Sequence, residues 1–241
     1  MAKTHGVEAY LTAIYTLESE DGFALSSHIA DYLHVSRPTV TQTIRRLTSL
    51  GYVQLSENRE IMLTALGKTK AEQVIRRHRL LERWLNDDLG IGWAEAHAEA
   101  DRLEHAISPL VEQRLMEKMG FPKSCPHGNI IPGSGNPQPK GILLSECASG
   151  ITVQVVRIVE QAEENLELLQ TFYRLGMVPG KIAHISRRED VPGKDVELHL
   201  IAGEKNMILT RNEAKWIMVK KVDQSQVNHV PNEDIVHIVE E

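Results

Sequence analysis

Histidine and carboxylate residues recur at helical spacing in the stretch from Arg77 to His105. His78 and Glu82 are four positions apart, so a helix places them on one face. One stripe of the next predicted helix carries His97, Asp101, Glu104 and His105. Two such helices facing each other bring imidazoles and carboxylates together, and these groups bind divalent metals. The stretch therefore predicts a metal site with nitrogen and oxygen ligands.

The chemistry of these candidate ligands narrows the metal and the class of protein. They include no cysteine, and an oxygen-rich set suits manganese or ferrous iron better than copper or structural zinc. The sequence has no H-E-x-x-H motif, nucleophile elbow or phosphate loop, so we expect no enzyme. The residues alone leave two alternatives: a metalloenzyme with a helical site, or a surface pair of His78 and Glu82 worth a few tenths of a kcal/mol.

The chain before this stretch has the pattern of a winged helix-turn-helix. Apolar periodicity and turn residues predict helices over 7–18, 25–33 and 36–50, and short strands over 52–55 and 60–63. Ser36 is a candidate N-cap of the third helix, Pro38 lies in its first turn, and Gly51 ends it. The strands form a hairpin around residues 56–59, which is the expected wing.

The third helix presents polar side chains that suit a DNA groove. Gln pairs with adenine, Thr and Pro pack on thymine methyl groups, and Arg contacts phosphate or guanine. Arg59, at the tip of the wing, is a candidate phosphate contact. The candidate DNA-binding residues are Ser36, Arg37, Pro38, Thr39, Thr41, Gln42, Arg45 and Arg59. The alternative is a solvated helix face, but the attached wing favours DNA binding.

The composition is that of an ordinary globular protein. The chain has 241 residues, 25% charged and 41% hydrophobic, with a net charge of -6, which argues against coating nucleic acid non-specifically. Cys125 and Cys147 form no C-x-x-C pair, no signal peptide is evident, and no apolar run approaches the roughly 20 residues of a membrane span. We expect a cytoplasmic protein with no membrane partner and no small-molecule substrate.

The middle of the chain predicts a helical domain that ends in a linker rich in Pro and Gly. Helical patterns cover residues 64–88, 93–107 and 109–119. Leu110, Val111, Leu115 and Met119 give the last helix an apolar face, which suits a dimer interface. A dimer would also supply the two half-sites that such DNA readers need.

Combined motifs give the chain a family resemblance. R-H-R-L-x-E-R followed by H-x-E-A-x-R-x-E-H, after V-E-A-Y-L-x-A-I-Y, resembles the diphtheria toxin repressor family of iron- and manganese-dependent regulators. The resemblance covers Val7 to about Val222. It implies a homodimer that represses metal-homeostasis genes by binding operator DNA when loaded with Mn(II) or Fe(II). It also implies an ancillary site of His78, Glu82 and His97 and a primary site of Asp101, Glu104 and His105.

Two positions depart from the family pattern. Ala9 stands where members carry a Met or Asp ligand, so water, Glu8 or His5 would have to replace it. Asp101 stands where iron regulators often carry Cys, and this harder donor favours manganese slightly over iron. The manganese-specific subgroup, however, often lacks the third domain that this chain has.

The linker and the last domain also resemble the family. C-P-H-G-N-I-I-P-G implies that Arg79, Cys125 and Asn129 lie near the ancillary site, although a rigid linker is an equal alternative. Strand patterns over 151–155, 181–186, 196–201 and 207–210, with a helix over 163–175, resemble an SH3-like β-barrel. Such a domain donates ligands to the ancillary site, for which Glu164 and Glu167 are candidates. The alternative for these two residues is a solvated acidic helix face.

The expected fold is therefore mainly α with a small β component. A winged helix-turn-helix covers residues 1–64, a helical metal-binding and dimerisation domain 65–141, and an SH3-like β-barrel 142–222. Residues 223–241 extend beyond the resemblance. The remaining alternative is a winged-helix regulator that responds to a small molecule instead of a metal.

Overall fold

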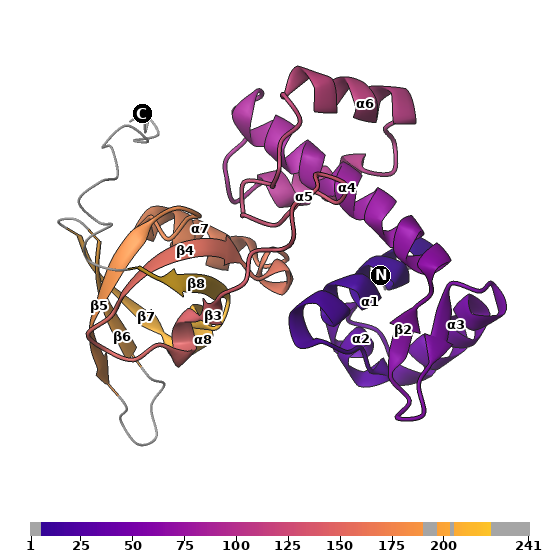
Figure 1. Cartoon of the computed structure of the whole chain (residues 1–241), viewed down its shortest axis with the longest axis horizontal. Helices are drawn as coiled ribbons and strands as arrows, with labels where there is room; N and C mark the ends of the chain where they lie inside the picture. The colour runs from indigo at the N-terminus through magenta and orange to yellow at the C-terminus, as the bar shows by residue number, and fades with distance from the viewer. Residues whose placement is uncertain (1–5, 190–196, 203–204, 223–241) are drawn as a thin grey trace. The chain divides into compact units, whose positions relative to one another are not determined.

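The computed structural model describes residues 6–189, 197–202 and 205–222 (Figure 1). They form two compact units, which are described separately below. The first combines the described residues up to Pro139 with Val159–Gln170, and the second combines Lys140–Ile158 with the described residues from Thr171 onward. None of the helices described is long and apolar enough to cross a membrane.

The first unit begins with the predicted winged helix-turn-helix. Its elements are α1 (Val7–Asp21), α2 (Ser26–Tyr32), α3 (Arg37–Ser49), β1 (Val53–Leu55) and β2 (Ile61–Leu63). Ser36 caps α3, because its side chain accepts a hydrogen bond from the Thr39 N–H at 3.3 Å. The helices enclose one apolar core to which Leu11, Ile29 and Leu47 contribute fully buried side chains. This core fixes the surface on which α3 is presented.

The wing is tied to the helix that follows it. β1 and β2 pair antiparallel, with Gln54 opposite Met62. Thr64 caps α4 (Ala65–Asp87) and also donates a hydrogen bond of 2.6 Å to the Gly51 carbonyl. Gly67 is required here, since a Cβ would lie 2.0 Å from the Tyr52 carbonyl oxygen. Helix α4 therefore starts directly on the winged helix-turn-helix.

The winged helix-turn-helix is followed in the first unit by helices α4, α5 (Ala96–Leu103) and α6 (Pro109–Lys118). Leu81 of α4 packs in one core with the fully buried Ala96 and Ala100 of α5. These small side chains let the two helices approach closely, which brings their polar faces together. Helix α5 is shorter than the predicted 93–107, because both ends of that stretch form turns.

Helix α6 carries apolar side chains on its outside. Leu110 is 62% exposed and Val111 is 44% exposed, although both belong to the face predicted for dimerisation. Leu115, one turn after Val111, is buried in the core that α6 shares with α4 and α5. The exposed residues therefore agree with a surface that a second copy covers.

The second unit contains an antiparallel sheet with strand order β3-β8-β4-β5-β6-β7 among the residues described (Figure 1). The strands are β3 (Ile142–Leu143), β4 (Thr152–Ile158), β5 (Ile182–Glu189), β6 (Glu197–Ala202), β7 (Lys205–Thr210) and β8 (Ile217–Lys221). The expected β domain is confirmed, and β3 and β8 add to the strands predicted. Val196, the predicted start of β6, and residues 223–241 lie outside the described residues.

The predicted helix over 163–175 begins later than expected. Helix α7 covers Leu166–Leu175, and a short 3-10 helix, η2 (Glu160–Ala162), precedes it. The Asn165 side chain accepts a hydrogen bond from the Leu168 N–H at 3.1 Å, which is the usual role of an N-cap. Residues 159–165 are therefore an irregular segment of the first unit.

Candidate metal centre

Two neighbouring helices bring donor atoms of His78, Glu82 and His97 together. Glu82 Oε1 lies 3.1 Å from His78 Nε2 and 3.0 Å from His97 Nδ1. The two imidazole nitrogens are 3.0 Å apart. Adjacent ligands of an octahedral ion at about 2.1 Å are separated by about 3.0 Å, whereas tetrahedral ligands are separated by about 3.4 Å. The three donor atoms therefore lie close enough together to bind one divalent ion.

Glu163 supplies a fourth buried donor. Its Oε2 lies 3.2 Å from His97 Nδ1, and its Oε1 accepts a 2.6 Å hydrogen bond from Asn129 Nδ2. Of the candidates from the sequence, Glu164 is 60% exposed with Oε1 3.8 Å from His97 Nε2, and Glu167 is exposed. The structure thus brings Glu163 into the cluster, one residue before Glu164. Sequence reasoning missed it because the irregular segment was predicted as helix.

A second donor group shares Glu82 and adds Cys125 and His127. His127 Nδ1 lies 3.4 Å from Glu82 Oε1 and 3.5 Å from Glu163 Oε2. His127 Nε2 is 2.9 Å from the Trp93 carbonyl oxygen, to which it donates. This bond leaves the Nδ1 lone pair of a neutral ring facing the cluster. Glu82 Oε2 has no hydrogen-bond partner among the described residues. The group therefore has free donor capacity for a metal.

His127 was not a candidate from the sequence. The only signal was the pairing of Cys and His, one residue apart, in C-P-H-G. The loop is held against α4 by Arg83, which donates to the carbonyls of Ser124 and Cys125 at 3.0 Å. These bonds, which periodicity does not reveal, place the loop at the metal cluster.

Arg79 and Asn129, which were also expected near the ancillary site, take part in the contacts that anchor the loop. Arg79 donates to the Ile130 carbonyl and forms a 2.8 Å ion pair with Glu160. Asn129 bonds to Glu163, as described above, and to Gln138 Nε2 at 2.8 Å through its amide oxygen. Arg79 and Asn129 thus support the cluster without facing it as ligands.

Burial and charge together set the protonation of the cluster. Burial alone would lower the pKa of His78, but the carboxylates of Glu82 and Glu104 raise it to about 9. Burial would raise the pKa of Glu82, yet His78 and His127 hold it well below its usual range. Burial, helped by Glu82, raises the pKa of the Cys125 thiol to about 12. Without metal, protons on the imidazoles therefore neutralise the carboxylates, and a bound ion must displace them.

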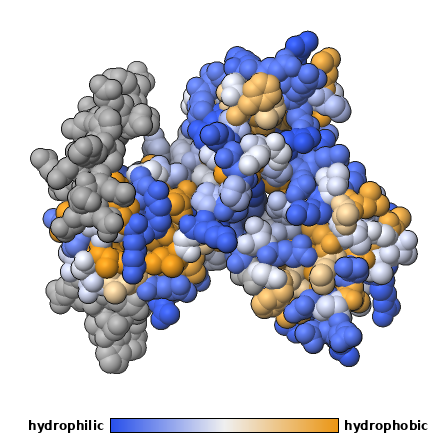
Figure 2. All heavy atoms as spheres, viewed as in Figure 1, coloured by the Kyte–Doolittle hydropathy of each residue, from blue (hydrophilic) through white to orange (hydrophobic). Residues whose placement is uncertain are grey.

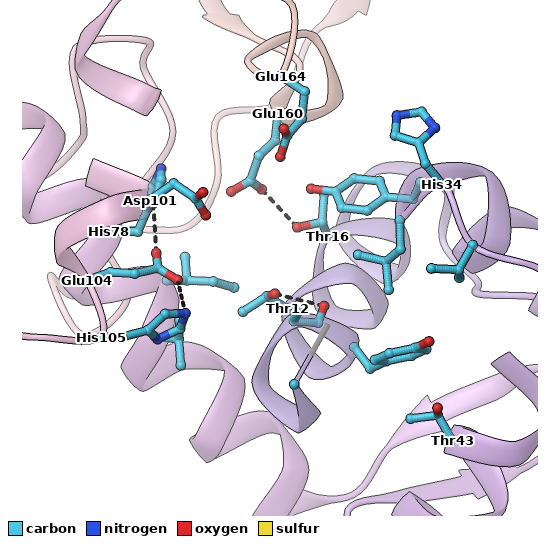
Figure 3. A pocket seen from close by; sticks show the side chains of 18 of the residues that line it. Thr12, Thr16, His34, Thr43, His78, Asp101, Glu104, His105, Glu160 and Glu164 are labelled. Atoms are coloured by element: carbon cyan, nitrogen blue, oxygen red, sulfur yellow. Dashed lines mark hydrogen bonds and ion pairs between the residues drawn. The ribbon is translucent and has the colours of Figure 1, made fainter. Parts of the chain in front are cut away.

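The residues expected at the primary site are less closely gathered. Glu104 bridges two histidines, with Oε2 2.8 Å from His78 Nδ1 and Oε1 3.3 Å from His105 Nε2. The other nitrogen of His105 lies 3.3 Å from Glu8 Oε2. Asp101 is exposed, and Figure 3 shows its carboxylate pointing into the adjoining cavity. Among the described residues, these side chains do not form a set of donors within 4.8 Å of one another.

A cavity of about 1030 Å³ separates α1 and α2 from the ligand helices (Figure 3). Asp101, Glu104 and His105 line one wall, and Glu160 and Glu164 line another. The threonines Thr12 and Thr16 of α1 face them. The space between the DNA-binding domain and the ligand helices is therefore polar and acidic on one side.

All candidate DNA-binding residues are exposed. Thr41 Oγ1 donates to the Arg37 carbonyl at 3.0 Å, while Gln42 and Arg45 project from the same helix. Arg59 takes a left-handed conformation with φ 63° in the wing turn. Figure 2 shows hydrophilic side chains over the tip of the wing. An exposed polar α3 beside a wing is the arrangement expected of a DNA reader.

The fold and the buried donor cluster define a class of protein: a winged-helix DNA-binding regulator with a metal centre. Three family models match in succession: the iron dependent repressor N-terminal DNA-binding domain at residues 4–61, its metal-binding and dimerisation domain at 64–133, and the FeoA domain at 142–221.

Curated relatives and solved structures agree with these matches. The chain is 36% identical over 226 residues to the iron-dependent repressor IdeR of Mycobacterium tuberculosis, covering 89% of this chain and 96% of the relative. It is 34% identical over 207 residues to the diphtheria toxin repressor of Corynebacterium diphtheriae, covering 79% and 91%. The structure of a manganese-dependent transcriptional repressor in complex with manganese matches with a TM-score of 0.79 at 30% identity, covering 90% of this chain and all of the other.

The chain belongs to the iron-dependent repressor family, which includes the diphtheria toxin repressor. It is a metal-dependent transcriptional repressor with DNA-binding and dimerisation domains, and it is not an enzyme. The family resemblance predicted from the sequence is confirmed, and the metalloenzyme alternative is wrong.

Proposed function

We propose that this repressor binds operator DNA as a homodimer when loaded with Mn(II) or Fe(II), and so controls genes of metal homeostasis. The observation that carries the proposal is the buried triangle of His78, Glu82 and His97 with Glu163 beside it. Similarity supports both metals, because the relatives above include iron-dependent and manganese-dependent repressors.

Manganese is slightly favoured by the donor chemistry. Asp101 is a hard carboxylate at the position where iron regulators of the family often carry Cys, and Glu104 adds a second. Cys125 is a softer donor, and its high pKa means that a metal must compete with a tightly held proton. This competition disfavours the thiol at neutral pH unless a more thiophilic ion is present.

The ligands divide into two regions in this proposal. His78, Glu82, His97 and Glu163 hold one ion, with Cys125 and His127 available to complete its shell. When bound, the ion supplies the positive charge that neutralises these carboxylates in place of imidazole protons. Glu104 connects this region to the second one through its bond to His78.

The second region comprises Asp101, Glu104 and His105, and Glu8 replaces the ligand that Ala9 lacks. Ala9 has no donor atom, whereas the Glu8 carboxylate already lies 3.3 Å from His105 and 3.2 Å from Lys70 Nζ. His5, the other candidate, lies outside the described residues. Because Glu8 belongs to α1, binding there would join the DNA-binding domain to the ligand helices.

The exposed residues of α3 and the wing then read the operator. Gln42 would contact a base edge, and Arg59 a phosphate. In this proposal the chain divides into domains at residues 1–64, 65–141, 142–222 and 223–241. The protein acts in the cytoplasm. Helix α6, with Leu110 and Val111, is the proposed surface for the second copy.

Fluorescence anisotropy tests the metal response directly. The probe is a duplex selected from a random library by the metal-loaded protein, titrated in chelator, in Mn(II) and, without oxygen, in Fe(II). We expect tight binding only with metal, by a dimer, and tighter binding with Mn(II) at equal free metal. Equal binding in chelator would refute the metal response, and stronger activation by Fe(II) would reverse the preference.

A further inference from the structure

We propose that Glu160 is a positioning residue that transmits the state of the metal centre to the helix-turn-helix motif through Thr16. The proposal rests on the metal response proposed above. It adds a route by which donor atoms on α4, α5 and the irregular segment influence α3.

The irregular segment carries the donor and the transmitting residue on one short turn. The Glu163 N–H bonds to the Glu160 carbonyl at 3.0 Å, and the Ala162 N–H bonds to Val159 at 2.9 Å. Val159, Ala162 and Glu163 are all buried. Because the turn is hydrogen-bonded and packed, movement of the Glu163 carboxylate toward a bound ion moves Glu160 as well.

Glu160 uses one oxygen to bind two different helices. Its Oε2 accepts a 3.0 Å hydrogen bond from Thr16 Oγ1 of α1 (Figure 3). The same oxygen accepts a 2.8 Å bond from Arg79 Nη2 of α4. Thr16 is 2% exposed and Arg79 is 4% exposed. Hydrogen bonds to a carboxylate strengthen when both partners are removed from water. Arg79 also directly follows the ligand His78, so both ends of this contact adjoin the metal cluster.

Thr16 lies on α1, which packs against α2. Thr16 and Tyr32 line the same cavity, and Leu17, the neighbour of Thr16, packs in the buried core that also holds Ile29 and Ala30 of α2. Tyr32 is the last residue of α2 and stands four positions before Ser36, the N-cap of α3. The contacts therefore run from the metal-binding segment to the turn that sets the recognition helix.

A purely structural ion pair between Arg79 and Glu160 would not need the additional hydrogen bond from Thr16. Arg79 alone neutralises the half-buried Glu160, so a bond to α1 is not required to satisfy the charge. A coupling role requires that the contact differ between the metal-free and metal-loaded forms. The shared turn of Glu160 and Glu163 gives a physical reason for such a difference.

The test replaces Thr16, which is neither a metal donor nor a DNA contact. Thr16→Val removes the hydroxyl, Thr16→Ser keeps it, and Thr12→Val is the matched control on the same helix. Among the described residues, the Thr12 hydroxyl donates to the Ala9 carbonyl at 3.0 Å and to no distant group, although Thr12 lines the same cavity. Operator affinity is measured by anisotropy with and without Mn(II), and Mn(II) affinity is measured by calorimetry with and without DNA.

We expect Thr16→Val to lower the ratio of operator affinities, with against without Mn(II), by about tenfold. Mn(II) affinity of the DNA-free variant stays as in wild type, while that of the DNA complex falls by the same factor, because coupling is reciprocal. Thr16→Ser restores the ratio, and Thr12→Val leaves it unchanged.

A wild-type ratio in Thr16→Val, with only a lower melting temperature, would overturn the proposal and leave Thr16 a structural role. Should Thr16→Val fail to fold, Glu160→Gln is measured in the same way, with the same two outcomes. If the wild-type protein itself shows no ratio above one, the proposed metal response fails, and this result is distinct from failure of the relay.

Discussion

Replacing Glu82 with Gln tests the electrostatic account of the metal-free cluster. Glu82 is fully buried, and its Oε1 lies between His78 Nε2 and His97 Nδ1. The substitution keeps the size of the side chain but removes the negative charge that raises the pKa of these imidazoles. The imidazoles should then lose their protons nearer to the ordinary histidine range.

The magnitude follows from the pKa of His78. A rise from 6.5 to about 9 corresponds to stabilisation on the order of 3 kcal/mol, at about 1.36 kcal/mol per pKa unit. A raised histidine pKa contributes its full stability below pH 6.5 and loses it as the pH rises through 9. Glu82, whose pKa is lowered, contributes only above its unfolded value and loses this contribution in acid. His78 and Glu82 together therefore stabilise the metal-free protein most at pH values above the unfolded pKa of Glu82 and below that of His78, which is 6.5.

Urea unfolding with a chelator at pH 6 and pH 9.5 measures this effect. Because Glu104 also raises the pKa of His78, we expect Glu82→Gln to lower the free energy of unfolding by at most about 3 kcal/mol at pH 6, and by less than about 1 kcal/mol at pH 9.5. Equal losses at the two pH values would refute the reasoning, because they would assign Glu82 a role in packing rather than in charge.

Four further predictions concern the metal, the fold and the DNA. Because the imidazoles must lose protons on binding, Mn(II) affinity should weaken below pH 7, and calorimetry in buffers of different ionisation enthalpy should show proton release; no release would contradict the protonated cluster. Glu8→Gln should weaken one Mn(II) equivalent and spare the other, whereas loss of neither would exclude Glu8 as a ligand. Ser36→Ala should cost about 1 kcal/mol in chemical unfolding by removing the cap of α3, and no change would mean that Ser36 is dispensable there. Gln42→Ala should relax base choice by roughly 1–3 kcal/mol in competition binding, while a uniform loss over all sequences would indicate a phosphate contact instead.

The sequence predicted those parts of the site that local helix geometry determines. A four-residue spacing on a helix fixes His78 beside Glu82 in any fold, and the caps Ser36 and Thr64 act where the third and fourth helices were expected to start. The family resemblance placed the facing helix with His97. These residues needed no knowledge of distant contacts.

The residues that were missed lie on segments without periodicity. His127 is positioned by the Trp93 carbonyl, and Glu163 by Asn129, so each depends on a contact between distant parts of the chain. Strand β3 was not predicted for the same reason, since its two residues become a strand only by pairing with β8. Patterns along the chain carry no information about such partners.

The most direct test of the central claim is the operator affinity of His97→Gln as a function of free Mn(II). The substitution removes one nitrogen from the buried triangle and leaves α3 and the wing unchanged. We predict that wild type tightens on the operator at least tenfold as Mn(II) rises, while the folded variant stays near its metal-free affinity. Equal Mn(II)-dependent tightening in both proteins would contradict the claim that this cluster controls DNA binding.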